Sequence, residues 1–359
     1  MPLPYEPRLE LSVVVPIYNE EGTVAPFLTA LARQQGIRLE VILSDGASSD
    51  RSIQVAQQLR AGLPFPLTIV EGTKGRGGQL NRGADAARAE TLLFLHIDSS
   101  FVDLLALRKG VDSLGEALRA GERVAGRFAL RFDFPGAVPL PYRFYGAKAA
   151  LDRPGCTHGD QGFLIRRDFF AQIGPYDTAR PLMEDTFLAE RVRREGRWIL
   201  LPADITTSPR RFLSEGLLPR QTINAILMNL AHTGQLSLVR CLQTSYRSQD
   251  ATAKLRLAPF LVPLHQAMDD LEPGQRRQLW RRTGAYVRGN AWQIAFFFDV
   301  LTGGIRQAGR GGRFLDLYDR FLGRLIDNKA GDLGAALLTW LWFRMTFLAA
   351  SRSSEPGRG

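Results

Sequence analysis

The sequence has very little cysteine. Of its 359 residues only Cys156 and Cys241 are cysteines, far apart in the chain. This excludes a disulfide framework and a zinc site of the Cys-x-x-Cys type. Such a count is typical of a protein that works in a reducing compartment, so we expect a cytoplasmic location.

The chain also lacks an uninterrupted run of about 20 apolar residues, the length that a membrane-spanning helix needs. Two stretches come closest: 290–305 is interrupted by Asp299, and 333–350 is interrupted by Arg344. The first ten residues contain three prolines and no apolar core, unlike a secretory signal peptide. We therefore expect no conventional membrane span and no signal peptide.

Acidic residues are fewer than basic ones, with 36 Asp and Glu against 46 Lys and Arg, a formal net charge of +10. This excess favours polyanions, anionic lipid surfaces or phosphorylated ligands. No recognition helix, zinc finger or ribonucleoprotein motif accompanies the charge, so we expect no nucleic-acid partner. With 45% hydrophobic residues, the chain is long enough for one large domain or a domain with an appendage.

What the sequence does contain is organised around residues 91–100, Thr-Leu-Leu-Phe-Leu-His-Ile-Asp-Ser-Ser. The apolar run suits a strand buried on both faces of a parallel sheet. It ends in His96 and Asp98 at the carboxyl end of the strand, where ligands bind in open α/β sheets. Asp98 is therefore a candidate metal ligand. The alternative is that it only caps the next helix.

Strand, loop and helix patterns repeat before this stretch at the spacing of βαβ units, which predicts a parallel sheet. The predicted strands are 11–16, 39–43 and 67–70, and Thr23 is predicted to cap the first helix. Acids follow three of the four strand ends: Glu20, Asp45 and Asp98. Successive acids at one sheet edge exceed what helix capping requires, so we interpret this edge as a binding crevice.

A glycine-rich stretch, 72–79, precedes a helix predicted from Leu80 to Ala89. The stretch lacks the Gly-Lys-Ser/Thr end of a P-loop, and Leu80 replaces the third glycine of the dinucleotide fingerprint. The residues predict a flexible loop in which Lys74, Arg76 and backbone N–H groups face a phosphate. A plain surface turn is the alternative.

Farther along, strands are predicted at 123–134, at 157–167 with a polar entry, and at 198–201. A helix at 186–195 follows Glu184 and Asp185, where the helix dipole would stabilise carboxylates without any function. Residues 1–235 are predicted to form one α/β domain, with 236–252 as a candidate linker. Amphipathic, aromatic and arginine-rich helices are predicted up to residue 350, as an added helical layer or a membrane-surface attachment, followed by a disordered tail at 351–359.

The motifs between residues 9 and 232 together resemble the family 2 inverting glycosyltransferases of the GT-A fold. Residues 13–21 are similar to the family's opening strand and nucleotide-binding loop, and 44–50 to a signature whose first acid contacts uracil in many members. The resemblance implies a mostly parallel, Rossmann-like α/β sheet with helices on both faces, followed here by a helical extension. The nucleotide-sugar-binding residues it implies are Pro16, Tyr18, Asn19, Glu20, Asp45, Gly46, Ser48, Arg76, Gln79, Asn81 and His96.

The family's Asp-x-Asp metal motif aligns with residues 96–98, where His96 replaces the first acid and Asp98, normally the direct ligand, is kept. This implies Mn²⁺ or Mg²⁺ as cofactor. The pair Glu184 and Asp185 resembles the Glu-Asp pair whose second member is the catalytic base. The resemblance places the acceptor and the diphosphate near Asp160, Gln161, Gly162, Arg210 and Arg211.

The implied activity is metal-dependent, inverting transfer of a sugar from a UDP- or GDP-sugar to a carbohydrate or lipid-linked acceptor. An anionic membrane surface is a further expected partner, which would place the protein at the inner face of the plasma membrane. The glycine-rich stretch, His96 and the Met-Glu-Asp segment are similar to a subgroup associated with arsenosugar biosynthesis.

Two alternatives stay open. One is a weakened nucleotide-sugar-binding or membrane-scaffold protein on the same fold, favoured by the missing metal-motif acid. The other is a nucleotidyltransferase, but that enzyme should carry a glycine-rich loop after the first strand, where this chain has 17–21.

Overall fold

The computed structural model describes residues 8–180, 182–247, 254–305 and 308–352. The chain divides into two compact units. The first unit runs through Ser208, except for 180–183, and also takes in 308–310; the second unit comprises the rest. Each unit is described by itself.

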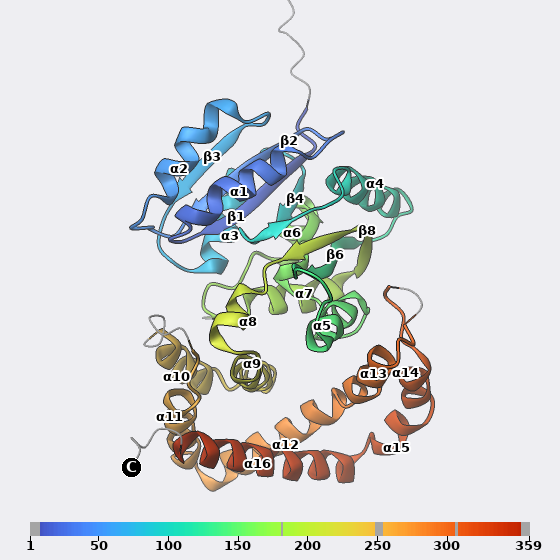
Figure 1. The fold of residues 1–359 in the computed structure, drawn as a ribbon. Coiled ribbons are helices and arrows are strands. Elements are labelled where there is room, and N and C mark those ends of the chain that lie inside the picture. The colour runs from blue at the N-terminus through green and yellow to red at the C-terminus, as the bar shows by residue number, and fades with distance from the viewer. Residues whose placement is uncertain (1–7, 181, 248–253, 306–307, 353–359) are drawn as a thin grey trace, which may run out of the picture. The chain divides into compact units, whose positions relative to one another are not determined.

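One mixed sheet forms the centre of the first unit, with its described strands in the order β3-β2-β1-β4-β7-β6-β8-β5 (Figure 1). The first four strands in this order are parallel, and so are β6 and β8. β7 is antiparallel to β4 and β6, and β5 to β8. The strands are β1 (Leu11–Ile17), β2 (Leu39–Asp45), β3 (Leu67–Glu71), β4 (Thr91–Phe94), β5 (Ser99–Ser100), β6 (Val124–Phe132), β7 (Phe163–Arg166) and β8 (Arg197–Thr207).

Helices cover both faces of this sheet because successive strand residues point to opposite sides. Val13 and Val15 of β1 pack with α1, α2 and α4, whereas Val14 packs with α3, α6 and α7. Strands buried on both faces need unbroken apolar runs, so the predicted α/β fold is confirmed. The helices are α1 (Glu21–Ala32), α2 (Ser52–Leu59), α3 (Arg76–Ala86), α4 (Ala106–Arg119), α5 (Leu140–Ala150), α6 (Arg167–Ile173) and α7 (Glu184–Glu195).

The described part of the second unit is helical, as predicted for the C-terminal part. Its core contains Leu230 of α9, Phe260 of α11 and Phe343 of α16. The predicted boundary at residue 235 falls between α9 and α10, inside this unit, and as a domain boundary it stays a prediction. The helices are α8 (Arg210–Glu215), α9 (Leu217–His232), α10 (Leu236–Arg247), α11 (Ala258–Asp269), α12 (Pro273–Gly289), α13 (Trp292–Leu301), α14 (Arg313–Leu317), α15 (Gly323–Ile326) and α16 (Lys329–Arg352).

Two helices begin earlier than predicted. α3 begins at Arg76 instead of Leu80, because the Gln79 side chain accepts the Gly75 N–H at 3.2 Å and closes the first turn. Half of the predicted phosphate loop is therefore helix. α1 begins at Glu21, and Thr23 donates its hydroxyl to Glu20 instead of capping the helix.

The predicted linker 236–252 was also wrong over its first part. Residues 236–247 form α10, whose buried Leu238, Val239 and Leu242 have the spacing of one helix face; 248–252 lie outside the described residues. β8 is longer than the predicted 198–201, and a 3-10 turn at Gly159–Gln161 replaces the polar start of the strand predicted at 157–167. Of the predicted tail, 351 and 352 end α16 and the rest lies outside the described residues.

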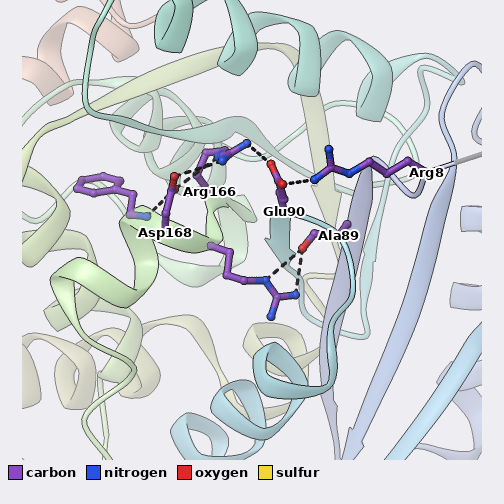
Figure 2. A network of polar contacts seen from close by, with 7 residues as sticks. Arg8, Ala89, Glu90, Arg166 and Asp168 are labelled. Carbon is purple, nitrogen blue, oxygen red and sulfur yellow. Dashed lines mark hydrogen bonds and ion pairs between the residues drawn. The ribbon is translucent and has the colours of Figure 1, made fainter.

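Charged side chains support the register between the central strands β4 and β7, at the amino end of β4 (Figure 2). Glu90, just before β4, accepts hydrogen bonds from Arg8 and from Arg166 at the end of β7. Arg166 also pairs with Asp168, and the neighbouring Arg167 donates to the Ala89 carbonyl. These ion pairs are exposed, so each contributes little to stability. Their effect is to hold Thr91 opposite Arg166.

We predict that Gly83→Ala destabilises the first unit although alanine favours helix. A Cβ at Gly83 of α3 would clash with Val14 of β1. Overpacking of this kind lowers the free energy of unfolding by about 1–3 kcal/mol. Gly115→Ala in α4 is the matched control, because no atom lies within 4 Å of its added Cβ. It should raise stability by up to ~1 kcal/mol. Urea unfolding of both variants checks this; equal effects would contradict the close packing of α3 on β1.

Candidate functional site

The loops after β1 and β2 are tied together by Ser48. Its hydroxyl donates to Asp45 at 2.5 Å, its N–H donates to the other Asp45 oxygen at 2.9 Å, and its Oγ accepts the Asn19 N–H at 2.9 Å. Asn19 has a φ of 54° and Ala47 a φ of 62°. This left-handed conformation is one that non-glycine residues adopt at a cost. Both oxygens of buried Asp45 thus shape this loop, and its predicted contact with a nucleobase stays a prediction.

Two amides predicted to bind the nucleotide sugar make contacts within the protein, and their part in binding stays a prediction. Gln79, almost fully buried, donates to the carbonyls of Ile17 at 2.7 Å and Ser44 at 2.8 Å, so it joins α3 to the ends of β1 and β2. Asn81 bonds both the N–H and the carbonyl of Tyr176 at 2.9 Å. These bonds make both residues positioning groups for the loops beside them.

On the exposed side of the same loops, the Lys74 ammonium lies 3.8 Å from the centre of the Tyr18 ring. This is cation–π geometry. The sequence predicted that Lys74 faces a phosphate, but no spacing rule would have paired it with Tyr18.

The centre of the candidate site is the Arg76 guanidinium at the start of α3. Its Nε pairs with Glu184 at 2.8 Å, and its Nη2 lies 2.9 Å from Nε2 of His96. Nδ1 of His96 lies 3.0 Å from Asp160. Because guanidinium only donates, Nε2 must accept; the imidazole is then neutral with its proton on Nδ1, directed at Asp160. We call Arg76, His96, Asp160, Glu184 and Asp185 the Arg76 cluster.

Asp185, the predicted base, is held at the start of α7. One of its oxygens accepts the Gly159 N–H at 2.7 Å and the other accepts the Thr186 N–H at 2.8 Å. A Cβ at Gly159 would come within 2.9 Å of His96 Nε2 and 3.0 Å of Asp185 Oδ2, so only glycine allows this approach. The 3-10 turn at 159–161 therefore brings Asp185 beside His96.

The Arg76 cluster is negatively charged overall, because three carboxylates surround one guanidinium and His96 is neutral. Burial raises the pKa of the Asp185 carboxyl, but the charge of Arg76 and the Gly159 N–H hold it below its usual value. Burial likewise raises the pKa of Asp160, and the His96 hydrogen bond and Arg76 hold it well below its usual range. Burial lowers the pKa of Arg76, but Glu184, Asp185 and Asp160 raise it above its usual value. Asp160 and Asp185 are thus ionised at neutral pH and suited to attract a cation.

A small cavity of about 10 Å³ opens into this cluster. A cavity of that size has room for about one water molecule. Sequence reasoning did not single out Gly159 or Tyr176 as site residues; the polar turn that holds His158 and Asp160 was the one available signal. The cavity is lined by residues of α3, β4, β7 and α7 and of the connecting segments beside them: Arg76, Leu80, Phe94, Leu95, His96, Gly159, Phe163, Tyr176 and Asp185.

Asp98, the predicted metal ligand, lies in the turn between β4 and β5. It is half-buried, and one oxygen accepts a long bond of 3.5 Å from Thr207. Both nitrogens of His96 are engaged, and the described residues contain no group of three side chains suited to a metal. Asp98 alone still fits Mg²⁺ or Mn²⁺ bound through one carboxylate, water and substrate phosphates.

The other residues predicted to lie near the acceptor and the diphosphate divide between the two units. Gln161 is fully buried and donates to Phe128 and Ala149, and Gly162 has a positive φ where a Cβ would meet Leu95 at 2.8 Å. These two support the turn that presents Asp160. Arg210 and Arg211 begin α8 in the second unit, so their part in the site stays a prediction.

Residues 12–174, somewhat less than half of the chain, match the family model described as glycosyl transferase family 2. A relative from Mycobacterium bovis, the "PGL/p-HBAD biosynthesis glycosyltransferase", is 29% identical over 178 residues, 48% of this chain and 66% of the relative. The chain thus spans slightly less than two thirds of that relative's length. The predicted arsenosugar subgroup finds no support in these relatives.

Two solved structures are similar in fold. S. aureus TarS 1–349 in complex with UDP has a TM-score of 0.47 at 16% identity, covering 82% of this chain and 87% of that one. The mannosyltransferase PcManGT from Pyrobaculum calidifontis, in complex with GDP-Man and Mn²⁺, has a TM-score of 0.45 at 19% identity, covering 96% and 86%. Likeness at this level assigns no ligand to this chain.

We predict that Asp160→Asn loses more stability at neutral pH than in acid. The folded pKa of Asp160 lies below its usual value. Since the unfolded value is about 3.9, the charge of Asp160 stabilises the fold above about pH 5. That contribution disappears as the pH falls through the folded pKa. The difference in Tm between wild type and variant should therefore be larger at pH 7 than at about pH 3. Asp270→Asn, in an exposed position, is the control; a gap independent of pH would contradict the ionised cluster.

Proposed function

We propose that the chain is a metal-dependent, inverting glycosyltransferase that moves a sugar from a UDP- or GDP-sugar to an acceptor hydroxyl. The observation that carries the proposal is the position of Asp185, an ionised carboxylate beside the one guanidinium of the Arg76 cluster, within a chain whose residues 12–174 match the family 2 model. The acceptor is a carbohydrate or a lipid-linked group.

In this proposal Asp185 is the base. It accepts the proton of the acceptor hydroxyl while the acceptor oxygen forms a bond to the anomeric carbon and the bond to the diphosphate breaks. A single displacement with one base inverts the anomeric carbon. Each oxygen of Asp185 already accepts one backbone N–H, but a carboxylate oxygen has a second lone pair for the hydroxyl.

Arg76 and Asp98 are proposed to serve the leaving diphosphate. In the described part of the chain Nη1 of Arg76 has no hydrogen bond, so it is available to the phosphate while Nε holds Glu184. Asp98 would hold Mn²⁺ or Mg²⁺, which would supply positive charge against the diphosphate. Three carboxylates nearby would repel a bare diphosphate, which is a physical reason for such a cation.

A weakened nucleotide-sugar-binding protein is the second candidate. The specific observation in its favour is that His96 stands in place of a metal-motif acid with both ring nitrogens already bonded. Turnover separates the two: a binder would gain stability from nucleotide sugars and release no nucleoside diphosphate. For either function we propose a cytoplasmic location with peripheral attachment to the membrane.

We predict that Asp185→Asn keeps donor binding and loses catalysis by a factor on the order of 10² to 10⁴, the usual contribution of a positioned base. UDP-glucose and GDP-mannose with Mn²⁺ are the probes; thermal shift reports binding, and release of UDP or GDP reports turnover. Asparagine keeps one oxygen, which can accept one of the two N–H bonds, so the variant should fold with a somewhat lowered Tm.

Asp168→Asn is the matched control for this test. Asp168 also lies in the first turn of a helix, and its Oδ1 accepts the neighbouring Phe169 N–H at 2.7 Å. If Asp185 were only such a cap, both variants would keep full turnover per folded molecule, and the assignment of the base would be wrong.

We predict that Asp98→Asn removes the Mn²⁺-dependent part of the stabilisation by UDP or GDP, because Asp98 is the one carboxylate kept from the metal motif. Thermal shift with nucleotide alone and with nucleotide plus Mn²⁺ measures that part. Asp112→Asn, an exposed carboxylate of α4, should leave it unchanged. Full Mn²⁺ dependence in Asp98→Asn would remove Asp98 from the site.

A further inference from the structure

The second unit carries most of the chain's exposed large apolar side chains. Of 23 such side chains in the described residues, 17 lie between Ile294 and Leu348 on α13 to α16 and the turns between them. Single exposed apolar residues are ordinary, but a concentration of them marks an interaction surface. The residues 313–325 show which kind of surface it is.

Four apolar residues in this segment recur at helical spacing. Phe314, Leu317, Phe321 and Leu325 follow one another at intervals of three or four residues and are 43%, 57%, 65% and 72% exposed. Helical spacing places them along one side of the segment. The segment runs from α14 through a π-helical turn at Tyr318–Leu322 into α15. We call the four residues the apolar stripe.

A row of arginines lies beside the apolar stripe. Arg313, Arg320 and Arg324 each directly precede a stripe residue, so helical spacing puts them about 100° around the axis from it. All three are exposed, and none forms an ion pair within the part of the chain that the structure describes. By the same spacing, Asp316 and Asp319 fall on the side away from the stripe. We call the three arginines the arginine row.

α16 has the length and composition to cross a membrane, since Arg344 is the one charge between 333 and 350. Its contacts favour a different arrangement. Asp332 of α16 pairs with Arg288 of α12 at 2.6 Å. The two helices also pack closely, because a Cβ added at Gly284 of α12 would lie 2.8 Å from the Ala336 Cβ.

Those contacts fix α16 against a helix that hydrocarbon would exclude. α12 contains five arginines, Arg276, Arg277, Arg281, Arg282 and Arg288. If α16 crossed a bilayer while packed on α12, these guanidinium groups would enter the hydrocarbon, where charged side chains are strongly disfavoured. Helices in this arrangement suit the membrane surface.

We propose that the apolar stripe and the arginine row insert this chain into the surface of a bilayer that contains anionic lipid, without spanning it. The stripe would enter the boundary between headgroups and acyl chains, and the arginines would bind lipid phosphates. A second copy of the chain fits less well, because a two-fold contact through this face would bring unpaired arginines together with no acid on the same side. The inference does not rest on glycosyl transfer.

Flotation of the full chain with vesicles tests this proposal. The vesicles are phosphatidylcholine alone and an equal mixture of phosphatidylcholine and phosphatidylglycerol, at low salt. Replacing the arginine row by glutamine should weaken binding to the mixed vesicles by roughly fivefold per charge removed. Replacing Leu317, Phe321 and Leu325 by serine should weaken binding to both kinds of vesicle by about tenfold or more.

The matched controls are Leu218→Ser, 79% exposed in the same unit, and Arg119→Gln, exposed in α4; both should bind as wild type. If the serine variant loses thermal stability, Leu325→Ser alone replaces it and should still weaken binding. Binding that neither triple variant changes would overturn the proposal. So would wild-type protein that resists alkaline carbonate extraction, which indicates a span, or a serine variant that only turns a dimer into a monomer.

Discussion

The Arg76 guanidinium is the one cation among the carboxylates of the candidate site, and the arrangement of that site depends on it. Glu184 is 7% exposed, and a buried carboxylate without a cation would be strongly disfavoured. Arg76 therefore allows α7 to begin at Glu184 next to the sheet, which in turn places Asp185 at the 3-10 turn. It also supplies the donor that leaves His96 neutral with its proton directed at Asp160.

Arg76 can take this position because the glycine-rich stretch is a packing element as well as an entry to a helix. A Cβ added at Gly77 would lie 3.4 Å from the Tyr176 Cβ. Farther along α3, a Cβ added at Gly83 would clash with Val14. The glycines thus bring α3 close to both the sheet and α7, and Gln79 joins its first turn to the ends of β1 and β2. The stretch resembles a phosphate loop in composition, but Gly77 within it packs against Tyr176 and Glu184.

Local patterns were enough to predict the sheet and the acids at its edge. The unbroken apolar runs of β1, β2 and β4 report burial on both faces, and this requirement acts on each strand separately. Gln79 shows why the contacts of the site residues were harder to predict. Its partners Ile17 and Ser44 lie 62 and 35 residues away in the sequence, and the residues next to Gln79 do not indicate whether its amide bonds the backbone or a ligand. The tautomer of His96 likewise depends on Arg76 and Asp160, which come from different elements.

In the helical second unit, sequence periodicity predicts the apolar face of a helix but does not show whether that face is buried or exposed. Leu238, Val239 and Leu242 of α10 repeat with nearly the same periodicity as the apolar stripe, yet they are buried in the second unit's core and the stripe is exposed. Burial in the second unit is what distinguishes them. The arginine row has no acid among the described residues to pair with, and a cation that the fold leaves unpaired beside an apolar surface matches the chemistry of a phospholipid, which offers phosphate and hydrocarbon within a few ångströms of each other. Solvent exposure and charge together thus assign a role to a pattern that hydrophobic spacing alone leaves ambiguous.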